Sequence, residues 1–184
     1  MSFKTSKHLV LSIIFLLIPI AFAMAGDNTE PSQDAEHKSP DIKNSEINWI
    51  PFDTGLVAAK REDKHVFVRF TTSWCKWCDK MDKETFTKPE VVTLVKENFI
   101  AVKVDGDSNE KLDIDGFKIT EKKLTRYEFG VRGYPTFCFL NSDGANLGCF
   151  SGYRPKDALI KYLNYVKDEK YDTTKTETST KNTK

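Results

Sequence analysis

The sequence has no marked excess of one charge sign and few long apolar runs. Its 184 residues carry 28 Lys and Arg against 27 Asp and Glu, a net charge of +1. A nucleic-acid groove needs clustered positive charge, so this balance argues against a DNA- or RNA-binding protein. The mean hydropathy is −0.48, and the N-terminal segment alone is long and apolar enough to enter a bilayer. A multi-span membrane protein is therefore excluded.

Cysteine is scarce and no internal repeat is present. Four cysteines in 184 residues are too few for a small scaffold held together by disulfides, so the core must come from packing. The polar stretch 26–45 contains almost no large apolar residue, and residues 171–184 are rich in Thr and Lys. We expect both to be disordered, as a linker and a tail. Residues 46–170 then form one domain.

The apolar N-terminal run covers residues 9–23 and follows two lysines. This layout is typical of a signal peptide, so residues 1–25 are predicted to be removed before Gly26, with a cut after Ala23 as second choice. An uncleaved anchor is the alternative, because residues 9–25 approach the length that spans a bilayer. We expect a periplasmic protein, with secretion or membrane attachment as alternatives. Export would place the cysteines in an oxidising compartment.

Hydrophobic periodicity predicts an α/β domain. Helices are expected over 52–59, 75–87, 89–99 and 120–127 and from Pro155 onward, and strands over 65–70, 99–104, 136–140 and 145–150. The order is α-β-α-β-α-β-β-α if the two helices that meet at Pro89 are taken together. The last two strands are predicted to form a hairpin around residues 141–144.

The chemistry is expected at Trp74-Cys75-Lys76-Trp77-Cys78, directly after the first strand and at the start of a helix. Two residues between the cysteines let the sulfurs meet across the first helical turn. The helix N-terminus and the charge of Lys76 would stabilise a thiolate on Cys75. Cys75 is therefore the predicted nucleophile, exposed at the helix start, and Cys78 the less exposed resolving thiol.

Other uses of a C-x-x-C pair fit less well. A structural disulfide would need neither the flanking tryptophans nor the position between strand and helix. A zinc site would need a second cysteine pair or finger-like histidine spacing, and covalent haem attachment needs His where Asp79 stands. A non-catalytic binding module stays open, in which the two thiols hold a protein partner or a soft metal such as Cu(I).

Two stretches resemble the thioredoxin superfamily. Residues 70–92 (FTTSWCKWCDKMDKETFTKPEVV) resemble exported proteins related to the C-terminal domain of the transmembrane reductase DsbD, and residues 127–136 (YEFGVRGYPT) resemble the substrate loop of protein disulfide isomerases. The resemblance implies a thioredoxin-like fold with a central mixed sheet of about four to five strands flanked by helices. It also implies a cis bond before Pro135, which packs against the sulfurs. Trp74, Tyr134 and Pro135 are the expected substrate-binding residues.

The same resemblance implies a thiol–disulfide oxidoreductase that needs no metal or organic cofactor. We expect a monomer whose partners are protein thiols and disulfides in the exported compartment, with a membrane electron donor as a further partner and no nucleic acid. The likeness to the DsbD domain favours a reductase. The charge of Lys76 favours a more oxidising couple, so the redox direction stays open.

One position departs from the family pattern. Thioredoxins carry a buried acid six residues before the first cysteine, where it moves protons to and from the resolving thiol, and this chain has Arg69 there. A buried positive charge would need a partner and would favour a thiolate at Cys78. The alternatives are that Arg69 points outward at a sheet edge or that the strand register is shifted by one.

Two further features need an interpretation. Cys138 and Cys149 would face each other across the predicted hairpin, as a structural disulfide, two buried free thiols or a second redox pair. Residues 105–119 start like an EF-hand loop, but Glu110 and Gly116 stand where such a loop needs Gly and Glu, so calcium is not expected. We interpret this stretch as an insertion that borders the active site and shapes partner choice.

Overall fold

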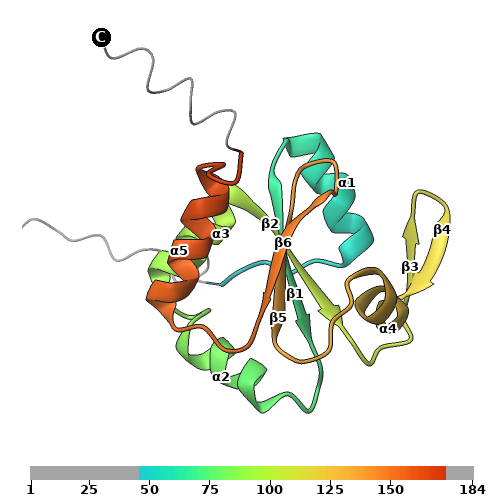
Figure 1. Cartoon of the computed structure of the whole chain (residues 1–184), viewed down its shortest axis with the longest axis horizontal. Helices are drawn as coiled ribbons and strands as arrows, with labels where there is room; N and C mark the ends of the chain where they lie inside the picture. The colour runs from blue at the N-terminus through green and yellow to red at the C-terminus, as the bar shows by residue number, and fades with distance from the viewer. Residues whose placement is uncertain (1–45, 173–184) are drawn as a thin grey trace, which may run out of the picture. The chain divides into compact units, whose positions relative to one another are not determined.

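The computed structural model describes residues 46–172 (Figure 1). The predicted signal peptide, the linker and all but the first residues of the tail lie outside this range. Among the described residues, no helix has the length and apolar character needed to cross a bilayer.

A mixed four-stranded sheet forms the centre of the domain, as predicted. Its strands, in spatial order, are β2 (Phe99–Asp105), β1 (His65–Thr71), β5 (Thr136–Leu140) and β6 (Asn146–Ser151). β1 pairs parallel with β2 and antiparallel with β5, and β5 pairs antiparallel with β6. The predicted hairpin of the last two strands is therefore confirmed.

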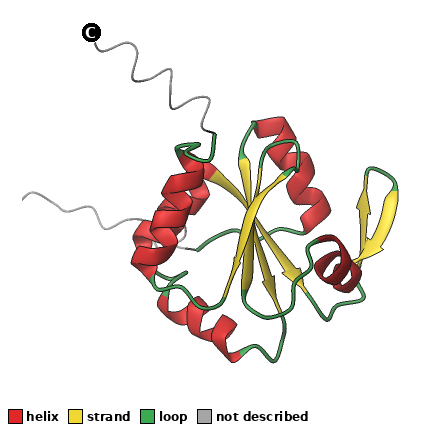
Figure 2. Cartoon of the chain, in the orientation of Figure 1, coloured by secondary structure: helices red, strands yellow, loops and turns green. Residues whose placement is uncertain are grey.

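Helices cover both faces of this sheet (Figure 2). They are α1 (Phe52–Glu62), α2 (Lys76–Glu84), α3 (Pro89–Asn98), α4 (Glu121–Lys123) and α5 (Lys156–Lys167), and α4 continues into the π-helical turn η2 (Leu124–Glu128). In Figure 1, α2, α3 and α5 lie on one side of the sheet, and α1 and α4 lie on the other.

The alternation of side chains along the strands produces two cores. Phe67 and its neighbours on one face pack against α2, α3 and α5, whereas Val66, Val68 and Phe70 face α1 and η2. Because β1 is central, both of its faces are buried, and its interior carries an almost unbroken apolar run. Arg69 is the exception, and it lies at 3% exposure in that run.

The structure differs from the prediction between β2 and α4. The predicted insertion is an antiparallel hairpin, β3 (Lys111–Ile114) and β4 (Phe117–Thr120), with Asp115 and Gly116 both at positive φ in the turn. The helix predicted over 120–127 begins after Thr120, whose hydroxyl accepts from the Lys123 amide, but it has only three α-helical residues before the π turn.

Several predicted boundaries also shift, and the helix predicted over 52–59 extends to Glu62. The helix expected to reach residue 87 ends at Glu84, where the Thr85 hydroxyl donates to the carbonyl of Arg154 at 2.9 Å. Tyr171, which the sequence assigned to the tail, lies with its hydroxyl 2.6 Å from a ring nitrogen of His65. The packed domain therefore extends at least to this tyrosine.

The topology brings three loops to one end of the sheet. Thr71, the last residue of β1, is paired with Asp105, the last residue of β2, and Phe70 is paired with Thr136, the first residue of β5. The residues after β1, after β2 and before β5 must therefore lie close together. Both predicted site segments lie at this end of the sheet, 74–78 in the loop after β1 and the first turn of α2, and 134–135 in the loop before β5.

Candidate active site

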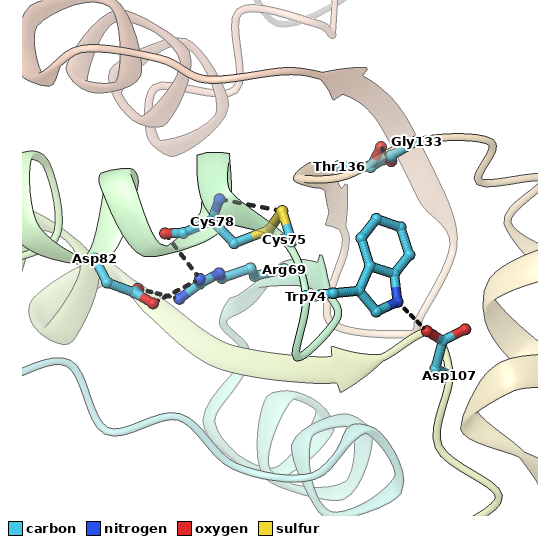
Figure 3. Close-up of a disulfide and its surroundings, with 8 residues drawn as sticks. All are labelled: Arg69, Trp74, Cys75, Cys78, Asp82, Asp107, Gly133 and Thr136. Atoms are coloured by element: carbon cyan, nitrogen blue, oxygen red, sulfur yellow. Dashed lines mark hydrogen bonds and ion pairs between the residues drawn. A yellow bond between two sulfur atoms is a disulfide. The ribbon is translucent and has the colours of Figure 1, made fainter.

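Cys75 and Cys78 are joined by a disulfide at the start of α2, with their Cα atoms 5.2 Å apart (Figure 3). Cys75 is the N-cap residue of this helix, and its backbone amide donates to the Thr72 carbonyl at 3.2 Å. Its sulfur accepts a hydrogen bond from the Cys78 amide at 3.1 Å. An amide donor at a helix N-terminus stabilises negative charge on the atom that it faces.

Both sulfur-bearing residues are enclosed. Cys75 is 4% exposed and Cys78 is 1% exposed, so the expected exposed Cys75 is not what the disulfide form shows. The exposed residues are the two tryptophans beside them, Trp74 at 64% and Trp77 at 56%. The dithiol thus lies beneath an apolar rim.

Trp74 is held on the side of the dithiol away from Arg69 (Figure 3). Its indole N–H donates to the carboxylate of Asp107, in the loop after β2. The ring of Tyr134 meets it edge-on with centroids 5.7 Å apart. A Cβ on Gly106 would clash with the Tyr134 hydroxyl, so this tyrosine packs directly over the glycine backbone. Burial, and then Asp107 and Asp105, raise the pKa of Tyr134 above its usual value.

The loop before β5 supplies the other predicted binding residues. The bond between Tyr134 and Pro135 is cis, and Pro135 is buried. The Thr136 hydroxyl donates to the Gly133 carbonyl at 2.7 Å and closes the turn that precedes the strand (Figure 3). Lys76 is exposed at the first position of α2. Stabilisation of a Cys75 thiolate by its charge stays a prediction.

Arg69 is buried on the face of β1 that α2 covers. An outward orientation at a sheet edge is therefore wrong, because β1 is a central strand. Its guanidinium forms two hydrogen bonds with the carboxylate of Asp82, one of them at 2.9 Å, and donates to the Cys78 carbonyl at 3.4 Å. The rings of Phe86 and Trp49 lie 5.1 and 5.7 Å from the guanidinium carbon.

A second group of side chains, of which Trp77 and Lys80 are exposed and Tyr153 is half-buried, flanks the rim along α2. The rings of Trp77 and Tyr153 lie 5.8 Å apart, and the ammonium of Lys80 is near both. The Tyr153 hydroxyl donates to Glu84 at 2.8 Å, and this hydrogen bond raises the pKa of the phenol. The segment before α5 is thereby attached to α2 beside the dithiol.

The other two cysteines lie in the β5–β6 hairpin. Cys138 pairs directly with Cys149, and a disulfide joins them with a Cα separation of 4.1 Å. Cys138 is fully buried and Cys149 is exposed on the edge strand. The four cysteines thus form two disulfides, and none is a free thiol.

The acidic loop after β2 has a structural use. The amide of Asp107 donates to the Asp105 carboxylate at 3.0 Å, and the Asp107 carboxylate accepts from Trp74. Within residues 46–172, no group of three or more His, Cys, Asp or Glu side chains is placed to hold a metal ion.

Sequence reasoning missed Asp82 and Asp107. The signal for Asp82 was available, since a buried Arg69 needs an acid and Asp82 stands four residues after Cys78, one helical turn along α2. In the sequence, Asp107 stands out only as part of the EF-hand-like start of residues 105–119. Its contact with Trp74 depends on how the loop after β2 folds, which the sequence pattern did not reveal.

Comparison with known proteins points to one family. A family model described as a thioredoxin-like domain matches residues 52–167. Spermatogenesis-associated protein 20 of Homo sapiens is 29% identical over 138 residues, which cover 71% of this chain and 16% of that protein. A protein disulfide-isomerase of Datisca glomerata is 29% identical over 156 residues, covering 84% of this chain and 27% of the isomerase. The chain therefore matches only a small part of the length of either relative.

A solved structure gives the same result. The solution structure of a thioredoxin from Thermus thermophilus is similar to this chain with a TM-score of 0.55 and 27% identity, and the match covers 65% of this chain and 86% of that one.

Proposed function

Since the chain belongs to the thioredoxin-like family, we propose that it is a thiol–disulfide oxidoreductase that exchanges disulfides with exported protein partners through Cys75 and Cys78. The observation that carries this proposal is the hydrogen bond from the Cys78 amide to the Cys75 sulfur at the start of α2. It favours the thiolate on Cys75, which is the nucleophile that exchange requires.

The reaction has two displacement steps. The Cys75 thiolate attacks one sulfur of a partner's disulfide, a bond forms between Cys75 and the partner, and the partner's second sulfur leaves as a thiolate. The Cys78 thiolate then attacks the Cys75 sulfur, the Cys75–Cys78 disulfide forms, and the partner's first sulfur leaves. Two electrons pass from the dithiol to the partner. The same steps in reverse let the disulfide form oxidise a partner's dithiol.

The surroundings of the disulfide suit a protein substrate. An apolar rim of Trp74 and Trp77 can cover a partner segment, while Tyr134 and Pro135 lie on the loop that would present its backbone beside Cys75. The charged side chains of the site already form hydrogen bonds within this chain, Arg69 with Asp82 and Asp107 with Trp74. The site therefore offers apolar contact and backbone hydrogen bonds.

The predicted signal peptide supports a location in the periplasm. There a membrane electron donor would reduce the Cys75–Cys78 disulfide again after each exchange. Export would also account for two disulfides in one chain, because disulfides persist in oxidising compartments.

Reduction of insulin disulfides by dithiothreitol tests the proposed function. The purified chain should accelerate insulin precipitation, and Cys75→Ser should abolish the acceleration because the attacking thiolate is lost. Asp79→Asn, an exposed change on the same helix, is the control and should retain activity. Failure of the parent chain both to reduce insulin and to reactivate scrambled ribonuclease would overturn the proposal and favour a non-catalytic binding module.

A further inference from the structure

Arg69 places a fixed positive charge beneath the resolving cysteine. Its side chain is 4% exposed, whereas the side chain of its partner Asp82 is 49% exposed. Water screens the carboxylate more than the guanidinium, so the field of the pair does not cancel inside the protein. The inner side of the ion pair, toward α2, is therefore positive.

The contacts fix this charge close to Cys78. One terminal nitrogen of the guanidinium donates both to Asp82 and to the Cys78 carbonyl, and Phe86 and Trp49 flank the group. Among the described residues, the Nε atom of Arg69 has no hydrogen-bond acceptor. The guanidinium thus has a single acidic partner and is packed between aromatic rings at the base of the dithiol.

We propose that the Arg69–Asp82 pair sets the redox equilibrium of the Cys75–Cys78 couple, with Arg69 stabilising the reduced form and Asp82 limiting that effect. The disulfide carries no charge, whereas the reduced couple carries at least one thiolate when it reacts. A nearby positive charge therefore favours the reduced couple over the disulfide and makes the protein a stronger oxidant. Arg69 acts here as a positioning and electrostatic residue and does not touch a substrate.

This inference deepens the proposed function and rests on it only for the assignment of Cys75 and Cys78 as the redox couple. In the equilibrium with glutathione, the Cys75–Cys78 disulfide is reduced to two thiols as two glutathione molecules are oxidised to one glutathione disulfide, a transfer of two electrons. No protein partner takes part in that equilibrium. It can therefore be measured even if the chain proves inactive toward insulin.

The test is equilibration of the full chain in glutathione buffers at pH 7, with the reduced fraction read by alkylation of Cys75 and Cys78 and peptide mass spectrometry. Arg69→Gln should move the equilibrium constant at least about threefold toward the disulfide form, and Asp82→Asn should move it in the opposite direction. Arg69→Lys keeps the charge and should stay near the parent value.

Two changes at the far end of the sheet provide matched controls. Arg61 and Glu62 form an exposed ion pair at the end of α1, before β1 begins, whereas the dithiol follows the other end of β1. Arg61→Gln and Glu62→Gln alter the net charge by the same amounts as the test variants. They should leave the equilibrium constant unchanged, because the charges are exposed and about 20 Å away along the strand.

A purely structural ion pair would give a different result. Loss of Arg69 would then lower the stability of both redox forms alike and leave the equilibrium constant unmoved. Unchanged constants, or shifts of the same sign for Arg69→Gln and Asp82→Asn, would overturn the proposal. If Arg69→Gln does not fold by circular dichroism, a shift toward the reduced form in Asp82→Asn with no shift in Arg69→Lys supports it, and its absence overturns it.

Discussion

At the scale of single residues, the site is built from pairs whose members lie far apart in the sequence. Trp74 is anchored by Asp107 and contacts Tyr134, and Arg69 is anchored by Asp82 next to Cys78. Each pair fixes one side of the dithiol. The two functional sulfurs therefore lie between a polar, positively charged floor and an aromatic wall.

The hydrogen bond between Trp74 and Asp107 should control how fast a protein substrate reacts. Asp107→Ala removes the acceptor and leaves an exposed indole held only by its contact with Tyr134. We expect the exchange rate with insulin to fall roughly three- to tenfold, as for loss of one exposed hydrogen bond with a net contribution of about 1 kcal/mol. Exchange with glutathione disulfide, which is too small to need the rim, should change little.

A double-mutant cycle gives this prediction its control. Trp74→Phe retains an aromatic ring but no N–H donor, so Asp107→Ala should have no further effect in that background. Asp115→Asn removes the same charge from the tip of the β3–β4 hairpin. Asp115 has φ 51, a left-handed conformation that Asn also adopts, so this change should be neutral. Additive effects of the Trp74 and Asp107 changes would show that their contact is not what matters.

At the scale of elements, the β5–β6 hairpin holds the substrate loop in place. The strand β5 begins directly after Pro135, and the Gly152 amide at the end of β6 donates to the Pro135 carbonyl at 2.8 Å. The disulfide between Cys138 and Cys149 ties the two strands together behind this loop. We expect this disulfide to stabilise the scaffold of the site.

Removal of that disulfide should lower stability and spare the chemistry. The double variant Cys138→Ala, Cys149→Ser should lose about 3 kcal/mol of unfolding free energy, the amount expected for a short closed loop. Urea unfolding followed by circular dichroism measures it. The folded variant should still reduce insulin, because Cys138 lies in the core on the α1 side of the sheet, whereas α2 packs into the other core, and Cys149 is exposed on β6.

Two outcomes would contradict a scaffold role for the hairpin disulfide. An unchanged urea midpoint would show that it adds no stability. Loss of insulin reduction in a variant that remains folded would instead indicate a second redox pair.

The elements that the sequence predicted well are those with a strong local pattern. β1 and β5 carry apolar and aromatic runs, Pro89 opens α3, and the turn before Gly144 joins β5 to β6. The β3–β4 hairpin was missed, although Asp115 and Gly116 between alternating apolar residues are a typical hairpin turn.

Other differences arise from tertiary contacts that no local pattern contains. α2 ends early because Thr85 bonds to Arg154, almost seventy residues later in the chain, and Phe86 turns into the core. The burial of Cys75 likewise depends on neighbouring loops. The position of the dithiol and the substrate loop could be predicted from motifs, whereas the partners Asp82 and Asp107 needed the fold.

At the scale of the whole described domain, the order of the strands explains why one site forms. The parallel pairing of β1 with β2 and the antiparallel pairing of β1 with β5 bring the ends of two strands and the start of a third to the same end of the sheet. Cys75, Asp107 and Tyr134 come from these three loops. A partner that reaches the disulfide must therefore approach this end of the sheet.

The central claim is that Cys75 attacks and Cys78 resolves, and trapping of mixed disulfides tests it most directly. Cys78→Ser should accumulate covalent complexes with partner proteins that appear on non-reducing gels and disappear after treatment with dithiothreitol, because the Cys75 thiolate can attack but no second thiol releases the partner. Cys75→Ser should trap few or none, since the amide hydrogen bond that favours a thiolate is made to the sulfur of Cys75. Equal trapping by both variants, or trapping by Cys75→Ser alone, would contradict the assigned roles.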